Sequence, residues 1–243
     1  MSSPAPAPSL ATLVAARLLD APLAALAWIL VERGVPILVA GRDPAISASL
    51  LDALVGALPA DRRPGGAAPG EAGRLVLVST ILATDSPPGV LRAALAATSG
   101  RSGLAVAIAA DNLEGVLAVL RRQGLADDEI AFLGVVLVVG APEGGAPEAG
   151  GQDDADLGAT PRARLVAAHY LRPVVRDAGG HTRRLAPAVL ATWNPATAAW
   201  EDFAWGIVPD LAERIGMRPG DLEAERERRA AALAGHAHGG PVG

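Results

Sequence analysis

Short apolar runs alternate with helix-like stretches along the first 140 residues. The runs are too short for helices, and they carry apolar residues at nearly every position, which is typical of strands buried on both faces. They cover residues 36–40, 74–79, 104–109 and 135–139. Between them, residues 9–33, 45–58, 85–97, 113–124 and 127–130 have helical spacing or helix start and stop signals. This alternation predicts an α/β fold with a mainly parallel sheet.

The second half of the chain has a different character. We expect strands in residues 164–174, 185–193 and 200–206, with the turn Asn194-Pro195-Ala196-Thr197 joining the last two as a hairpin. Residues 209–215 and 221–233 read as helices. The predicted organisation is a disordered start (1–8), an α/β core (9–140), a flexible Gly/Pro/acidic loop (141–161), strands, hairpin and helices that complete the same domain (162–234), and a tail (235–243).

The amino-acid composition argues against several classes of protein. The net charge is −5 and no basic run occurs, which disfavours a nucleic-acid surface. Cysteine is absent, so disulfides and thiolate metal sites are excluded and a reducing compartment fits. We find no signal peptide or transmembrane segment, so we expect a cytoplasmic protein, with peripheral attachment to the inner face of the membrane as a further option.

Residues 35–54 read as a buried strand, a Gly-led turn and a helix, which is the local plan of a phosphate-binding P-loop. A working P-loop has the pattern G-x-x-x-x-G-K-[ST], in which lysine reaches the phosphates and Ser or Thr holds Mg²⁺. Counted from Gly41, the last three positions are Ile46, Ser47 and Ala48. All 21 residues of the Lys+Arg count are arginine, so no lysine is present anywhere in the chain. The scaffold of the motif is present without its fixed cation.

The order of these segments resembles a known family. Residues 31–41 match the run into a Walker A loop, residues 74–78 fall at a Walker B strand, and residues 105–111 fall at a His-box strand. On these segments, residues 24–140 resemble the RecA-like core of the type II/type IV secretion and type IV pilus ATPases. Residues 164–173 and the 193–205 hairpin resemble that family's closing strands. The resemblance implies a three-layer RecA-like P-loop NTPase-type fold with a β-rich C-terminal extension.

The departures from the family pattern fall on its catalytic positions. The Walker A lysine position is Ser47, the Walker B acid falls on Ser79 or Thr80, and the His-box histidine position is Ala109. Asp43 adds a negative charge where an anion would bind. Phosphoryl transfer depends on positioning and charge neutralisation, so the loss of these groups removes most of the catalytic machinery.

The sequence therefore suggests a non-hydrolysing pseudo-ATPase without a cofactor. It would act as a binding or regulatory subunit for a protein partner, either an active homologous ATPase or a membrane-platform protein. The alternative is an ATP- and Mg-dependent ATPase whose site is rebuilt, with Arg42 and Ser49 substituting and a partner supplying missing groups. The candidate nucleotide-binding residues are Gly41, Arg42, Asp43, Ser47 and Ser49. The plainer interpretation of this segment is a strand-to-helix turn kept for packing.

Other polar residues and the aromatic residues have structural interpretations beside functional ones. Asp111 and Asn112 fit either remnants of the His box or a helix N-cap, and His169 and His181 lack partners at metal-ligand spacing. A hairpin holding four aromatic residues is either a cross-strand packing cluster or an exposed patch that binds another protein. The four residues are Trp193, Trp200, Phe203 and Trp205.

Overall fold

The structure is a computed structural model. It describes residues 8–64, 76–83, 85–98, 103–141, 163–176, 182–183 and 185–238. Residues 1–7 of the expected disordered start, most of the expected loop at 141–161 and the end of the tail lie outside these residues, as does His181.

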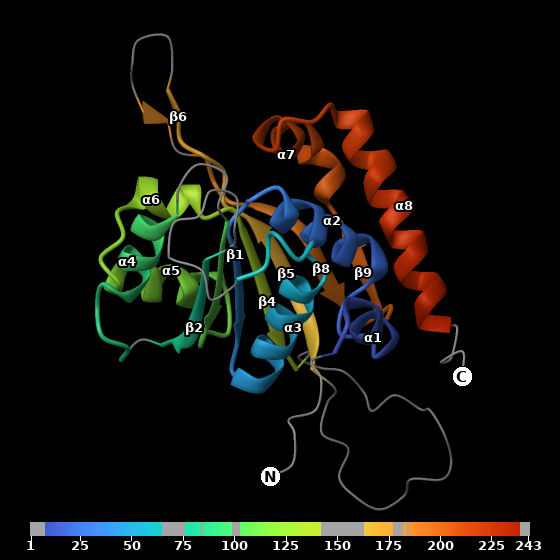
Figure 1. The fold of residues 1–243 in the computed structure, drawn as a ribbon, viewed down its shortest axis with the longest axis horizontal. Coiled ribbons are helices and arrows are strands. Elements are labelled where there is room, and N and C mark those ends of the chain that lie inside the picture. The colour runs from blue at the N-terminus through green and yellow to red at the C-terminus, as the bar shows by residue number, and fades with distance from the viewer. Residues whose placement is uncertain are drawn as a thin grey trace, which may run out of the picture.

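One mixed sheet runs through the molecule (Figure 1). Its seven strands have the order β2-β3-β1-β4-β5-β8-β9. The strands are β1 (Ile37–Gly41), β2 (Val76–Leu82), β3 (Leu104–Ile108), β4 (Val135–Gly140), β5 (Arg164–Tyr170), β8 (Ala188–Asn194) and β9 (Ala199–Asp202). A separate pair joins β6 (Val175–Arg176) to β7 (Thr182–Arg183).

The sheet is parallel in one half and antiparallel in the other. β2, β3, β1 and β4 pair in parallel. β5, β8 and β9 then continue from β4 in antiparallel pairs. The α/β class is confirmed, but the expectation of a mainly parallel sheet is correct only for the first half. The short 194–199 connection explains part of the difference, because a hairpin can join only antiparallel strands.

Helices cover both faces of the parallel half. They are α1 (Leu10–Ala15), α2 (Ala21–Glu32), α3 (Pro44–Gly56), α4 (Val90–Ala97), α5 (Leu113–Arg122), α6 (Asp127–Phe132), α7 (Val208–Arg214) and α8 (Pro219–His238), with a 3₁₀ helix η1 (Ala204–Ile207). In Figure 1, α4, α5 and α6 gather at the left, while α8 lies at the right beside α1 and α2.

Two hydrophobic cores lie between the sheet and the helices, one on each face. Ile37 and Val39 of β1 face the core shared with α1, α2, α3, α7 and α8. Leu38 and Ala40, which alternate with them, face the core shared with α4, α5 and α6. A strand buried on both faces needs apolar residues at every position, which is why the short apolar run predicted this strand so well.

Side-chain caps set where several helices begin. The side chains of Ser9, Asp20, Asp43 and Asn112 each accept a hydrogen bond from a backbone N–H of the first turn that follows. The cap of α5 is therefore Asn112, which confirms the structural interpretation for this residue.

Several expected boundaries are wrong. The helix expected from residue 85 begins only at Val90, as α4. β2 ends at Leu82, later than the expected 79, while residues 74–75 lie outside the described part of the chain. Residues 204–206, expected as strand, belong to η1, because the pairing of β9 with β8 ends near Asp202 and the chain turns there. α8 extends to His238, so the first residues of the expected tail are helical. Alanine favours helix, and Gly235 lies inside α8 without ending it.

Candidate functional site

The candidate site lies where the carboxyl ends of β1 and β3 meet. These strands are neighbours in the sheet, and the helices that follow them pack on opposite faces. α3 follows β1 and contributes to one core, while α5 follows β3 and contributes to the other. In open α/β sheets, ligands bind in the crevice outside the carboxyl ends of the strands at such a switch point.

An ion pair spans this crevice. Arg42 follows β1 and Asp111 follows β3, and Arg42 Nε lies 2.7 Å from Asp111 Oδ1. The hydrogen bond and charge of Arg42 hold the pKa of Asp111 below its ordinary value. Both side chains are well exposed, at 85% and 45%, so the pair contributes little to stability. The pair matters for anion binding instead. Arg42 is the cation next to Gly41, and the Asp111 carboxylate already neutralises its charge.

The amino end of α3 is occupied by the protein's own carboxylate. Asp43 is the N-cap, and its Oδ1 accepts a hydrogen bond of 2.8 Å from the backbone N–H of Ala45. Pro44, at the first helical position, has no N–H to offer. A phosphate bound to a P-loop uses the backbone N–H groups at this end of the helix. In this chain residue 44 has no N–H group, and the N–H of Ala45 already donates to Asp43.

Ser47 occupies the position of the missing lysine and points inward. It is fully buried, and its Oγ has no hydrogen-bond partner among the described residues. A Cβ added to Gly41 would lie 2.7 Å from Ser47 Oγ and 3.0 Å from the Val139 carbonyl oxygen. The turn is thus packed closely against the end of β1, which explains why residue 41 is glycine.

The remaining positions of the family pattern add no charge to this crevice. Ser49 is half-buried on α3, and Ile46 packs against the core below. Ala109 follows β3, and its N–H donates to the Leu82 carbonyl oxygen of β2. The side chains of residues 76–80, which include the Walker B positions, lie outside the described part of the chain.

Removing the Asp43 side chain tests the capping arrangement. We expect Asp43→Ala to lower the free energy of unfolding by about 1 kcal/mol, because the N–H of Ala45 loses its acceptor. Asp43→Asn should cost almost nothing, since asparagine caps as well as aspartate. Urea unfolding of the two variants compares them directly. Equal losses would show that the charge of Asp43, and not its hydrogen bond, matters for the fold.

The four aromatic residues do not form one patch. Trp193 of β8 and Trp200 of β9 are cross-strand partners whose rings meet edge to face, with centroids 4.6 Å apart. Trp200 Nε1 donates to the Leu165 carbonyl oxygen, and the guanidinium of Arg164 lies 4.5 Å from the Trp193 ring centroid. These two tryptophans pack within the sheet, as the structural interpretation expected.

Phe203 and Trp205 lie beyond the hairpin. Trp205 belongs to η1 and its exposed fraction is 74%, while Phe203 precedes η1 and is 41% exposed. The placement of Trp205 on the hairpin is therefore wrong, because the strand ends at Asp202. Of the four residues, only Phe203 and Trp205 are exposed.

His169 is half-buried on β5, with Val136 and Val189 as its partners on the neighbouring strands. Burial lowers the pKa of its imidazole below the ordinary value of 6.5. No group of three or more metal-ligating side chains occurs within the described ranges. Nor does any helix among those same residues have the length and apolarity needed to cross a membrane.

The lowered pKa of His169 predicts a pH dependence. Between about pH 7 and pH 5 the unfolded chain binds a proton on this residue more readily than the folded chain, so stability falls as the pH drops through its ordinary pKa of 6.5. His169 can change the free energy of unfolding by at most about 1.4 kcal/mol per pH unit. Unfolding titrations across this range should show a flatter profile for His169→Gln. Parallel profiles would mean that His169 titrates equally in both states.

The chain has no match among protein-family models and no significant match among curated protein sequences.

Proposed function

We propose that this chain is a non-hydrolysing relative of the secretion and pilus ATPases that acts as a binding or regulatory subunit. The observation that carries the proposal is the Asp43 carboxylate at the amino end of α3, where a nucleotide phosphate would need the helix N–H groups. The pairing of Arg42 with Asp111 supports it, because the nearest cation is already matched. The family assignment rests on the sequence resemblance of residues 24–140 alone.

The charge balance of the crevice supports the first of the two hypotheses. Asp43 and Asp111 supply two negative charges, and Arg42 supplies one positive charge. A triphosphate adds several more negative charges, and it would have to compete with Asp111 for Arg42. In a working site a fixed lysine and a bound Mg²⁺ neutralise this charge. The described residues beside the turn offer no equivalent, which favours a binding protein over an ATPase.

Calorimetry with Mg-ATP tests the proposal. We expect no binding stronger than about millimolar and no phosphate release, since the binding energy of the phosphates is missing. Retention of the native fold is checked in the same sample by thermal unfolding. Micromolar affinity with turnover would contradict the proposal and establish the rebuilt-site ATPase.

A pair of arginine variants makes that test specific. If the rebuilt site exists, Arg42→Gln abolishes nucleotide binding, because Arg42 is its only candidate cation in the turn. Arg33→Gln is the matched control, since Arg33 is exposed at the end of α2 and lies outside the turn. Equal binding by both variants would place any nucleotide elsewhere.

The protein partner would be an active homologous ATPase or a membrane-platform protein, and the exposed aromatic pair Phe203 and Trp205 is the contact that we favour. Large aromatic side chains often dominate binding energy at interfaces. In a pull-down with such a partner, Trp205→Ala should lose binding without loss of stability, because this side chain is mostly in solvent. Unchanged binding would exclude Trp205 from the interface.

A further inference from the structure

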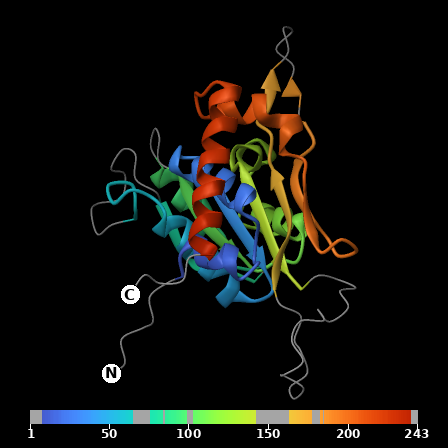
Figure 2. The same ribbon diagram turned by 90° about the vertical axis from the view of Figure 1, so that its right-hand side faces the viewer.

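The C-terminal helix α8 packs across α1 and α2 (Figure 2). Leu222 and Leu233 are its buried apolar side chains among the described residues, and Ala230 packs against the same core while partly buried. The surface beneath is far more apolar, because eight of the twelve residues of α2 are buried hydrophobic residues. A polar helix therefore covers an apolar one, with few apolar contacts of its own.

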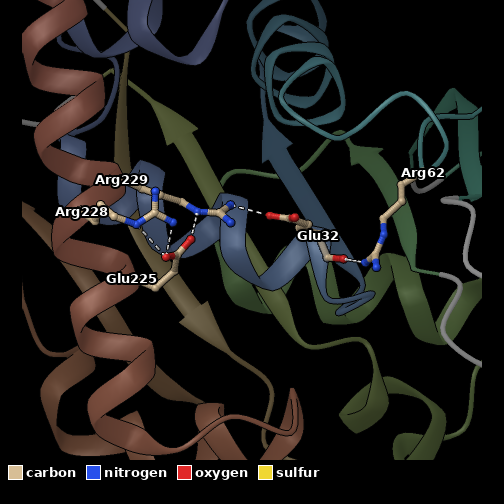
Figure 3. A network of polar contacts seen from close by, with 5 residues as sticks. All are labelled: Glu32, Arg62, Glu225, Arg228 and Arg229. Atoms are coloured by element: carbon tan, nitrogen blue, oxygen red, sulfur yellow. Dashed lines mark hydrogen bonds and ion pairs between the residues drawn. The ribbon is translucent and has the colours of Figure 1, made fainter.

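Arg229 makes the central contact between the two helices (Figure 3). Its Nη1 lies 2.6 Å from Glu32 Oε2 at the end of α2, and its Nε lies 2.6 Å from Glu225 Oε1 of α8. The guanidinium also stacks on Trp28 of α2, 4.3 Å from the ring centroid. The side chain is only 15% exposed, so this cation is largely removed from water. Arg62 donates to the Glu32 carbonyl oxygen and secures the end of α2 from the other side.

Arg226 makes a second contact one turn earlier on α8. It pairs with Asp202 of β9, and its Nε donates to the Pro22 carbonyl oxygen at 3.1 Å. This side chain is also 15% exposed. Arg226 and Arg229 together, called here the arginine latch, thus bind α8 to both ends of α2 and to the edge of the sheet.

Ionic contacts of this kind hold a helix in place without stabilising it strongly. Removing two charges from water costs energy that their attraction only partly returns. Trp28 Nε1 is also buried beneath α8 with no hydrogen-bond partner in the described residues, which adds a further cost. Docking of α8 therefore rests on these charge pairs together with Leu222 and Leu233, and salt weakens the pairs only in part because they are partly buried.

α8 is also able to persist as a helix away from its docking surface. Its 20 residues are rich in alanine, glutamate and arginine, which are strong helix formers. Within the helix, Glu225 pairs with both Arg228 and Arg229, and Arg218, just before the helix, pairs with Asp221. Undocking need not cost the helical structure of this segment.

We propose that α8 is a detachable cover, held closed by the arginine latch, which undocks from α1 and α2 as a helix while the rest of the chain stays folded. The pivot is the connection between α7 and α8, where Gly216 has a φ of +66° and no atom within 4 Å of an added Cβ. Opening exposes the apolar outer side of α1 and α2. The inference does not depend on the proposed function, because it uses no feature of the nucleotide site.

Two spin labels measure this motion, since the chain has no cysteine to interfere. One label is placed on α8 by Ala231→Cys and one on α3 by Asp52→Cys, both at exposed positions. The distance distribution is recorded between about 0.01 M and about 1 M salt, over which the screening length falls from about 30 Å to about 3 Å. We expect one short distance at low salt and a second, longer distance that grows as salt rises.

Variants assign the effect to the latch. Arg229→Gln should raise the undocked population by about tenfold at low salt, because Glu32 loses its partner across the interface. Arg228→Gln is the matched control, since Arg228 is 71% exposed and pairs only within α8 in the described contacts. It should behave as the parent chain does. Glu32→Gln should match Arg229→Gln, and the double variant should add little further.

The salt series decides the proposal even if a latch variant folds poorly. A distance distribution of the parent chain that stays the same from low to high salt overturns it. So does a longer distance that appears only together with loss of hydrogen-exchange protection in β1 and β3, because the whole domain would then be unfolding. Protected central strands combined with a salt-dependent longer distance support it.

Discussion

Replacing Gly134 with alanine is expected to destabilise the protein by about 4 kcal/mol or more, which is enough to unfold many domains. Gly134 lies between α6 and β4 with a φ of +82°, where a side chain is strained. The added Cβ would lie 2.5 Å from Val35 Cγ1 and 2.9 Å from the Pro36 carbonyl oxygen. The backbone oxygen cannot move without shifting the start of β1. Denaturant unfolding gives the loss, and a failure to express folded protein would agree with it.

Gly124 provides the matched control for this variant. Its φ of +83° is nearly the same, but the nearest atom to an added Cβ is Arg92 Nε at 3.9 Å, on a flexible side chain. Gly124→Ala should therefore cost only the left-handed backbone strain, about 1–2 kcal/mol. Equal losses for the two glycines would show that close packing at Gly134 is not the cause.

Replacing Leu120 with alanine is expected to cost about 3 kcal/mol of unfolding free energy. Leu120 is fully buried on α5, in the core between the sheet and α4–α6. The loss combines the transfer of the removed atoms with the cavity left behind. Urea unfolding at constant pH measures it, with the slope of the transition showing whether the variant still unfolds in one step.

Leu117 is the control on the same helix, one turn earlier. It is only partly buried against the same core, so Leu117→Ala should cost about 1 kcal/mol. Helix propensity changes equally in both variants and cancels in the comparison. A larger loss at Leu117 than at Leu120 would contradict the burial pattern of α5.

The same helix shows how far the sequence pattern can be trusted. The spacing of apolar residues along this segment of the sequence predicts that Leu113, Val116, Leu117 and Leu120 form the buried face. The buried residues are Val116, Val119 and Leu120, while Leu113 and Leu117 are only partly buried. Periodicity therefore located the helix and its approximate face. Its rotation against the sheet was not predictable, because it depends on the shapes of neighbouring side chains.

The candidate site likewise has features that the sequence predicts and features that only the structure shows. The sequence identified the P-loop-like turn and the loss of its lysine, since both are local. It did not reveal that Arg42 pairs with Asp111, 69 positions further along the chain, because that contact exists only when β1 and β3 are neighbours. The inward direction of Ser47 likewise follows from the packing of α3 against Gly41. Composition gave no sign of the contact between Arg164 and Trp193.

The sequence by itself determined the α/β class, the buried strands and most helix starts, because periodicity, capping and turn signals act over a few residues. Only the tertiary structure decided the strand order, the antiparallel half of the sheet and the docking of α8 on α2. Those features depend on contacts between segments far apart in the chain, such as Glu32 with Arg229. Many arginines and acids in the sequence could form such a pair, and the folded backbone selects which of them meet.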